Sequence, residues 1–113
     1  MKKLLVAAAL LLAQVAPAAA ANLNCWDTRN IRTNSSPAGT YRNTASSSVD
    51  YIEATNTGVA KLFASLSLPA YATGNYAICL EGTSTWVGSK RVWKVSAAVI
   101  CYMNRVSHNT CQG

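Results

Sequence analysis

Side chains that could carry out hydrolysis are few in this chain of 113 residues. His108 is the single histidine, and no serine has the Gly-x-Ser-x-Gly setting of an activated nucleophile. A secreted nuclease would combine a glutamate base, this histidine as acid and arginines on the phosphate. The available residues are Glu53 or Glu81, His108, Arg91 and Arg105. No spacing connects them, so the sequence favours a non-enzymatic protein and leaves a small secreted nuclease or hydrolase as an alternative.

Cationic and aromatic side chains alternate in the segment 86–94, which is the predicted binding site. Its residues are Trp86, Lys90, Arg91, Trp93 and Lys94. Gly88 and Ser89 suit a two-residue type II′ turn, which would place Trp86 opposite Arg91, close enough for a cation–π contact. Because side chains alternate along a strand, both lysines share one face, and Arg91 and Trp93 share the other. We therefore expect an outward basic face, with Trp93 directed into the core.

Four cysteines lie beyond the N-terminal region: Cys25, Cys79, Cys101 and Cys111. An even number in a short exported chain predicts two disulfides. We favour Cys25–Cys79 with Cys101–Cys111, because Cys101 is the nearest partner that can hold the C-terminal tail. The alternative joins Cys79 to Cys101, as between two facing strands of a sandwich. No Cys-x-x-Cys pair is present, so we expect neither a metal site nor a cofactor.

The N-terminal residues 1–21 have the three parts of a secretory signal peptide: Lys2 and Lys3, an apolar run over 4–15, and small residues before the cleavage point. The run is too short to span a membrane, so we expect one exported domain, residues 22–113, without a membrane span. The signal is typical of bacterial proteins and predicts a periplasmic or secreted location. The formal net charge of +6 includes those two lysines, so the exported part stays basic. A basic domain favours either solubility or an anionic partner.

Turn residues divide the domain into short segments that read as strands. The expected strands are 49–55, 59–68, 76–81, 83–87 and 90–102. The first two flank Asn56-Thr57-Gly58 and predict a hairpin. Apolar residues of 59–68 also recur at helical spacing, so a helix stays open as the alternative there, as it does for 96–105. Gly82 is expected to end the strand that precedes it.

Five or six short strands with evenly spaced turns predict an all-β, mainly antiparallel fold. We expect a small disulfide-stapled β-sandwich or barrel with room for one short helix. Pro37 and Gly39 mark a turn before a short strand around Tyr41. The stretch 74–79 resembles the Tyr-then-Cys region of immunoglobulin-like domains, with its spacing different by one residue, and this resemblance suggests that architecture.

Export, disulfides and the cationic–aromatic hairpin together predict an exported, non-enzymatic binding module. Within that class, the sequence favours an inhibitor or immunity-type protein that presents a rigid hairpin to another macromolecule. The expected partner is another protein or an anionic macromolecule, with nucleic acid the less favoured choice. A structural cell-surface or pilus-like component is a further alternative, which an edge strand open to strand addition would favour.

Overall fold

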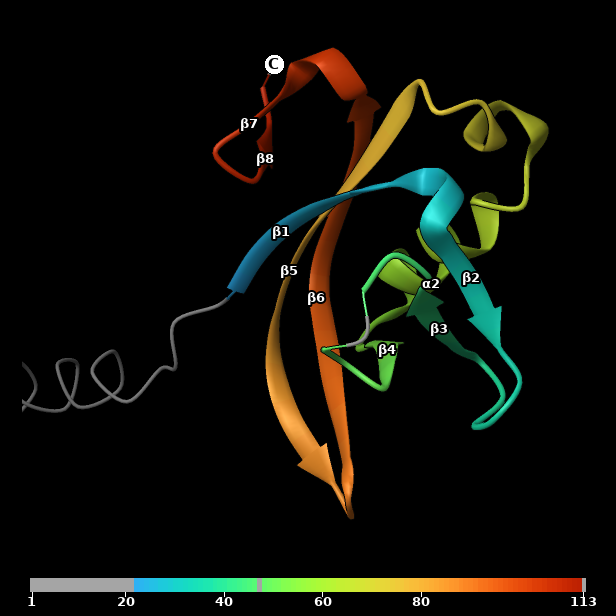
Figure 1. Cartoon of the computed structure of the whole chain (residues 1–113), viewed down its shortest axis with the longest axis vertical. Coiled ribbons are helices and arrows are strands. Elements are labelled where there is room, and N and C mark those ends of the chain that lie inside the picture. The colour runs from blue at the N-terminus through green and yellow to red at the C-terminus, as the bar shows by residue number, and fades with distance from the viewer. Residues whose placement is uncertain (1–21, 47, 113) are drawn as a thin grey trace, which may run out of the picture.

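Two long antiparallel strands form the centre of the structure (Figure 1), a computed structural model that describes residues 22–46 and 48–112. The predicted signal peptide, residues 1–21, lies outside the described residues. The strands are β1 (Asn22–Asp27), β2 (Ile31–Asn34), β3 (Thr40–Asn43), β4 (Tyr51–Ala54), β5 (Tyr76–Val87), β6 (Lys90–Tyr102), β7 (Val106–Ser107) and β8 (Thr110–Cys111). The helical segments are α2 (Thr57–Ser65) and the short 3₁₀ helices η1 (Thr28–Asn30), η2 (Pro69–Ala72) and η3 (Met103–Arg105).

Six strands form one sheet in the order β1-β5-β6-β4-β3-β2, and β7 pairs with β8 in a small second sheet. All neighbours are antiparallel except β4 and β6, which run parallel. The described chain is mostly β with one α-helix, which confirms the predicted fold class. Because β1 and β2 stand at opposite ends of the order, the sheet is open and is not a barrel. An immunoglobulin-like domain stacks two antiparallel sheets, whereas this fold has one large mixed sheet and a two-stranded hairpin.

Different elements cover the two faces of the large sheet. Ile78 and Leu80 of β5 point toward α2, which buries Val59 and Phe63 against them in the main core. Cys79 alternates with these residues and lies on the opposite face, where its Sγ is 3.3 Å from Cys111 Sγ of β8. The helix therefore covers one face of the large sheet, and the C-terminal hairpin lies against the other.

The segment expected to be the second strand of a hairpin is a helix, so the favoured prediction was wrong and its helical alternative is confirmed. The side chain of Asn56 is the N-cap, and its Oδ1 accepts a hydrogen bond of 2.9 Å from the Val59 N–H. Val59, Phe63 and Leu66 then fall on one buried stripe at helical spacing. The intervening alanines and serines fit either period, which is why alternation also appeared in the sequence.

Gly82 does not end a strand as expected, because β5 continues through it to Val87. A β-bulge between Glu81 and Gly82 shifts the register against β6 at this point. A Cβ atom on Gly82 would overlap the Lys94 carbonyl oxygen and would lie 2.8 Å from Trp93 Nε1. Glycine is therefore required for close approach of the strands rather than for a turn. The β6 strand runs on to Tyr102, so the strand prediction holds there and the helical alternative for 96–105 is limited to the short η3.

The two disulfides are Cys25–Cys79 and Cys101–Cys111, which confirms the favoured pairing and rules out the alternative bridge between Cys79 and Cys101. Cys25 and Cys79 occupy facing positions on β1 and β5. Cys101–Cys111 attaches the β7–β8 hairpin to the end of β6. Two disulfides fit an oxidising, extracellular-type environment. Within the described residues, helices are too short or too polar to cross a membrane.

Candidate binding site

The β5–β6 hairpin projects from one end of the molecule and has the predicted register (Figure 1). Trp86 is the cross-strand partner of Arg91, and Val87 is the partner of Lys90. Gly88 has a φ of +64°, as the first central residue of the predicted turn requires. The Trp86 side chain is 69% exposed, and Lys90 and Arg91 are exposed beside it. These three residues, Trp86, Lys90 and Arg91, are called the hairpin tip below.

The other two residues of the predicted site do not belong to an open surface. Trp93 is 4% exposed, as the prediction of an inward ring requires, so it is part of the core and cannot contact a partner. Lys94 is only half-exposed. Between the two lysines Val92 is completely buried, together with its β4 partner Tyr51. The expected basic outward face is therefore wrong at its centre, where Val92 lies beside Tyr51 of β4 and is buried.

Asp50 fixes the base of the hairpin tip. Its carboxylate accepts a hydrogen bond of 2.7 Å from the Arg91 backbone N–H, and its own N–H donates to the Arg91 carbonyl at 2.9 Å. The Arg91 guanidinium takes no part in these bonds. Among the described residues, the one ion pair within 4.0 Å joins Arg29 to Asp27, with an N–O distance of 2.8 Å. Within the described residues, no acidic oxygen therefore lies within 4.0 Å of the Lys90 or Arg91 side-chain nitrogens, and the nearby Asp50 carboxylate binds the backbone instead.

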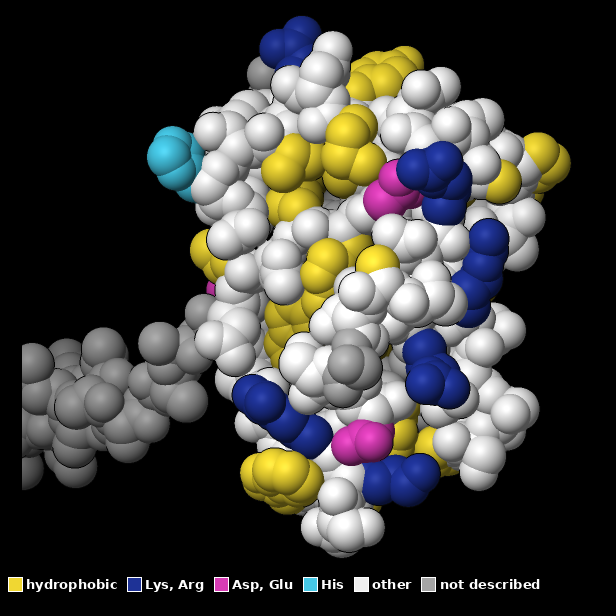
Figure 2. Space-filling view, viewed as in Figure 1, with side chains coloured by type: hydrophobic (Ala, Val, Ile, Leu, Met, Phe, Trp, Pro, Cys, Tyr) yellow, Lys and Arg dark blue, Asp and Glu magenta, His cyan; other side chains and the backbone are white. Residues whose placement is uncertain are grey.

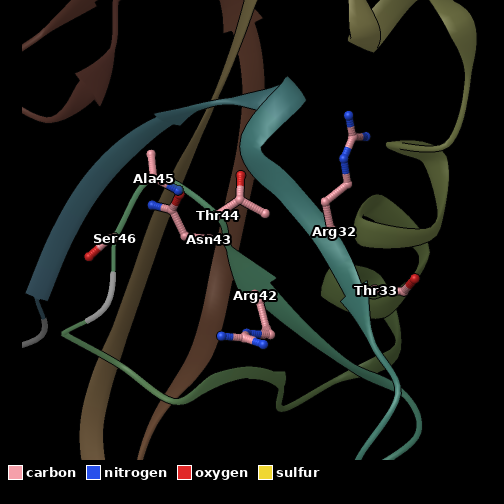
Figure 3. A pocket seen from close by; sticks show the side chains of 7 residues that line it. All are labelled: Arg32, Thr33, Arg42, Asn43, Thr44, Ala45 and Ser46. Atoms are coloured by element: carbon pink, nitrogen blue, oxygen red, sulfur yellow. The ribbon is translucent and has the colours of Figure 1, made fainter.

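A second basic surface lies on the β2–β3 hairpin and was missed by the sequence analysis (Figure 3). It is a hollow of about 570 Å³ that is lined by Arg32, Thr33, Arg42, Asn43, Thr44, Ala45 and Ser46. Arg32 and Arg42 are ten positions apart in a stretch rich in turn residues, where nothing in composition pairs them. The turn at Pro37 and Gly39 was the available signal, because pairing the residues on either side of it brings the two arginines together.

Aromatic side chains gather at the opposite end of the sheet from the hairpin tip. The rings of Tyr76 and Tyr102 stack with centroids 4.9 Å apart, and Tyr71 meets Tyr76 edge to face at 5.2 Å. Tyr102 is 59% exposed. The neighbouring Tyr102 hydroxyl, followed by burial, holds the pKa of the Tyr76 phenol above its usual value. This shift does not make the phenol a base at neutral pH, so the cluster is a packing surface rather than an acid–base site.

The Asp27–Arg29 pair is the other perturbed group. Hydrogen bonding to the Arg29 guanidinium lowers the pKa of the Asp27 carboxyl, against a smaller opposing effect of burial. Asp27 also caps η1, because its Oδ1 accepts a bond of 2.9 Å from the Arg29 N–H. The guanidinium lies over Gly74, so this ion pair connects η1 to the turn before β5. The arrangement is structural and leaves Asp27 ionised.

The structure does not gather the residues that a nuclease would need. The five candidates were Glu53, Glu81, Arg91, Arg105 and His108. Glu81 lines a mainly apolar hollow of about 230 Å³ between β1, β5, β6 and β8, and none of the other four candidates lines it. His108 is exposed in the turn of the β7–β8 hairpin, with a φ of 52°. Asp50 is the acidic residue beside Arg91, and its carboxylate accepts a hydrogen bond from the Arg91 backbone N–H.

Figure 2 shows Lys and Arg side chains spread along one side and the lower end of this face, while hydrophobic side chains line a hollow at its centre. Acidic side chains are sparse on the same face. No protein-family model, no curated protein and no solved structure matches the chain. Inferences about its function therefore start from these surfaces.

Proposed function

We propose that the chain is an exported, non-enzymatic binding module, most specifically an inhibitor or immunity-type protein that docks on an acidic face of another protein through the hairpin tip. The observation that carries this proposal is the exposure of Trp86, at 69%, beside two cations that make no ion pair within the described residues. Tryptophan and arginine are the residue types that most often dominate binding energy at protein interfaces. The compartment is the periplasm or the medium, which the predicted signal peptide and the two disulfides support.

The hairpin tip is suited to binding because its backbone is already ordered. A two-residue turn, continuous pairing of β5 with β6 and the Asp50 bonds hold Trp86 and Arg91 in place. Little conformational entropy would be lost when such a surface docks into a cleft. Free cations around an aromatic anchor would speed encounter with an acidic partner and exclude basic ones.

The test is a pull-down with the exported, oxidised protein from the periplasm and medium of its own organism. The variants are Trp86→Ala and the charge reversal Lys90→Glu/Arg91→Glu. The matched control is Lys61→Glu/Arg105→Glu, which makes the same change in net charge at exposed positions away from the hairpin tip. Thermal unfolding of each variant verifies that it is folded.

We expect one protein to be retained by the wild type and the control, and lost with both hairpin-tip variants. A partner that survives Lys90→Glu/Arg91→Glu would remove the hairpin tip as the site and keep only the binding class. Equal loss with the control would mean that net charge alone is responsible. With no partner retained at all, the enzyme and structural alternatives would gain weight, and cleavage of RNA and polysaccharide would be assayed next.

A further inference from the structure

We propose that the β2–β3 hairpin binds a phosphate group, either a free phosphate or a phosphate ester, between Arg32 and Arg42. This site is separate from the hairpin tip and does not depend on the function proposed above. The ligand chemistry is an oxyanion with several acceptor oxygens, because the residues that line the hollow include two arginines and an asparagine amide (Figure 3).

Register holds the two arginines on one face of the hairpin. Arg32 and Arg42 are direct cross-strand partners, so their Cβ atoms are roughly 5 Å apart. The adjacent pairs turn to the other face, where Ile31 is 3% exposed and Tyr41 packs on Phe63 with ring centroids 4.7 Å apart. A slip of one residue would expose this apolar set, so the register that directs both cations outward is fixed by the core.

No carboxylate of the described chain neutralises this pair. Asp27 is bound to Arg29, and Asp50 accepts from the Arg91 N–H. Glu53 is beside Lys94 in the β4–β6 register. Within the described residues, no acidic oxygen lies within 4.0 Å of Arg32 or Arg42. Like charges directly opposite each other destabilise a strand pair. The two facing cations therefore form a site of positive charge that a bound anion would neutralise.

Neutral groups at the rim add a donor and hold it still. Asn43 Oδ1 accepts a bond of 3.0 Å from the Ala45 N–H, which leaves the Asn43 amide nitrogen without a partner among the described residues. The Thr44 N–H donates to the Asn30 carbonyl at 2.8 Å, and this bond holds the loop against η1. The hydroxyl of Thr44 donates to the same carbonyl at 3.2 Å. The amide is therefore presented from a fixed loop rather than from a mobile one.

The composition of the lining favours an oxyanion such as phosphate over a metal ion or a nucleobase. The lining contains no carboxylate or imidazole for a metal ion and no aromatic ring on which a nucleobase could stack. In Figure 3 the two guanidinium groups extend away from each other, so a phosphate that contacts both would require at least one arginine side chain to change its rotamer. Guanidinium forks match the oxygens of phosphate with paired hydrogen bonds. The volume of about 570 Å³ leaves room for the rest of an ester.

The first experiment is a titration of the oxidised full-length exported protein with sodium phosphate at low ionic strength, followed by NMR of the arginine side chains and backbone amides. Sodium chloride at equal ionic strength is the reference. The variants are Arg32→Gln and Arg42→Gln, with Arg32→Lys/Arg42→Lys to keep the charge and remove the forks. Arg91→Gln and Arg105→Gln are matched controls, because each removes one exposed arginine elsewhere.

We expect phosphate to shift the Arg32, Arg42 and Asn43 signals beyond the effect of chloride. Either glutamine variant should weaken binding roughly tenfold, as loss of a charge-assisted hydrogen bond implies. The lysine double variant should also bind more weakly than the wild type. Equal weakening in the Arg91 or Arg105 controls, or the same shifts with chloride, would overturn the proposal, because binding would then follow net charge alone. The backbone spectrum of each variant shows whether it remains folded.

A second experiment separates the sources of the phosphate group. The same proteins are sedimented with vesicles of phosphatidylcholine that contain phosphatidylglycerol, and with phosphatidylcholine alone. Retention on phosphatidylglycerol vesicles that is lost in Arg42→Gln and kept in Arg105→Gln would identify a phosphodiester headgroup as the ligand. Phosphate binding in solution without vesicle retention would identify a soluble phosphate or phosphate ester. Equal vesicle retention of the wild type and the Arg32 and Arg42 variants, together with no effect of phosphate in the titration, would overturn the proposed site.

Discussion

Trp26 of β1 and Trp93 of β6 meet edge to face, with ring centroids 4.9 Å apart and ring planes at 74°, although β5 runs between their strands. Gly82 of β5 leaves room for the Trp93 indole, whose Nε1 would lie 2.8 Å from a Cβ placed there. This Nε1 is buried and has no hydrogen-bond partner among the described residues. The Trp93 indole therefore packs against Trp26 with its N–H unsatisfied, and it occupies space that a side chain at position 82 would need.

The substitution Gly82→Ala should destabilise the protein by about 3 kcal/mol, because the added methyl group forces β5 away from β6 and displaces Trp93. Urea unfolding followed by circular dichroism measures the change. The matched control is Gly58→Ala in the first turn of α2, where a Cβ meets nothing closer than 3.4 Å. The control should leave stability unchanged or raise it by up to about 1 kcal/mol. Equal effects at both positions would show that β5 and β6 do not approach closely at Gly82.

Replacing Trp86 by Phe should remove most of the fluorescence that acrylamide can quench, because Trp93 is buried and Trp26 half-buried. The free energy of unfolding should change by less than about 0.5 kcal/mol, as at other exposed positions. Trp93→Phe is the counterpart, and it should leave the quenchable component in place. Persistence of strong quenching in the Trp86 variant would mean that the core tryptophans are accessible.

Loss of the helix cap in Asn56→Ala should cost about 1 kcal/mol of stability. The side chain also donates from its amide nitrogen to the Ser96 carbonyl at 2.9 Å, so it joins α2 to β6 as well as capping the helix. Asn56→Asp keeps the acceptor for the Val59 N–H and loses this second bond, so its stability should fall between wild type and alanine. Urea unfolding of the three proteins checks this order of stability. An aspartate variant no more stable than the alanine variant would show that the cap does not stabilise the helix.

Acid should weaken the contribution of the Asp27–Arg29 pair. The pKa of the Asp27 carboxyl is lowered in the folded state by Arg29, so its stabilisation is present above the unfolded value of about 4 and is lost as pH falls through the lowered pKa. In Asp27→Asn, the cap remains and the charge is gone. The difference in unfolding free energy between wild type and this variant should therefore be largest near neutral pH and shrink in acid. Arg29→Gln should shrink the pH dependence in the same way, and a difference constant with pH would contradict the pairing.

The two disulfides should differ in their contribution to stability. Cys25–Cys79 closes a separation of 54 residues and Cys101–Cys111 a separation of 10. Restriction of the unfolded chain predicts a loss of about 4 kcal/mol for Cys25→Ala/Cys79→Ala and about 3 kcal/mol for Cys101→Ala/Cys111→Ala. Urea unfolding of the oxidised proteins measures both losses. A reversed order would show that local contacts of the β7–β8 hairpin outweigh chain entropy.

Local patterns predicted the parts of the fold that depend on neighbouring residues. The β5–β6 register followed from Gly88-Ser89, because a two-residue turn determines which residues face each other. The disulfide pairing followed from the position of Cys111 near the tail. The same local patterns wrongly predicted a hairpin turn at Asn56-Thr57-Gly58. Asparagine is common both at the start of a helix and in a turn, and Gly58 is compatible with either structure.

Contacts between distant segments could not be read from the chain. The parallel pairing of β4 with β6 places Tyr51 beside the buried Val92, and no local pattern in the sequence predicts this pairing. For this reason the basic face expected on the hairpin is limited to its tip. The facing arginines on β2 and β3 depend on a hairpin register within a loop-like stretch, so composition alone did not reveal them. Burial of Trp93 was predicted, because strand alternation places it with Val95 on the core face.

The positions of the two bridges determine how the molecule would carry mechanical load. A pull applied at residues 22 and 112 crosses to Cys79 through one bridge and to Cys101 through the other, so tension bypasses residues 26–78 and 102–110. Apart from the short ends 22–25 and 111–112, the strand pair between Cys79 and Cys101 is the part that can lengthen while the bridges are intact. That extensible segment is the hairpin that carries Trp86. A partner bound at the hairpin tip would therefore contact the segment that extends under load. The two segments closed by the disulfides, 26–78 and 102–110, would not be extended.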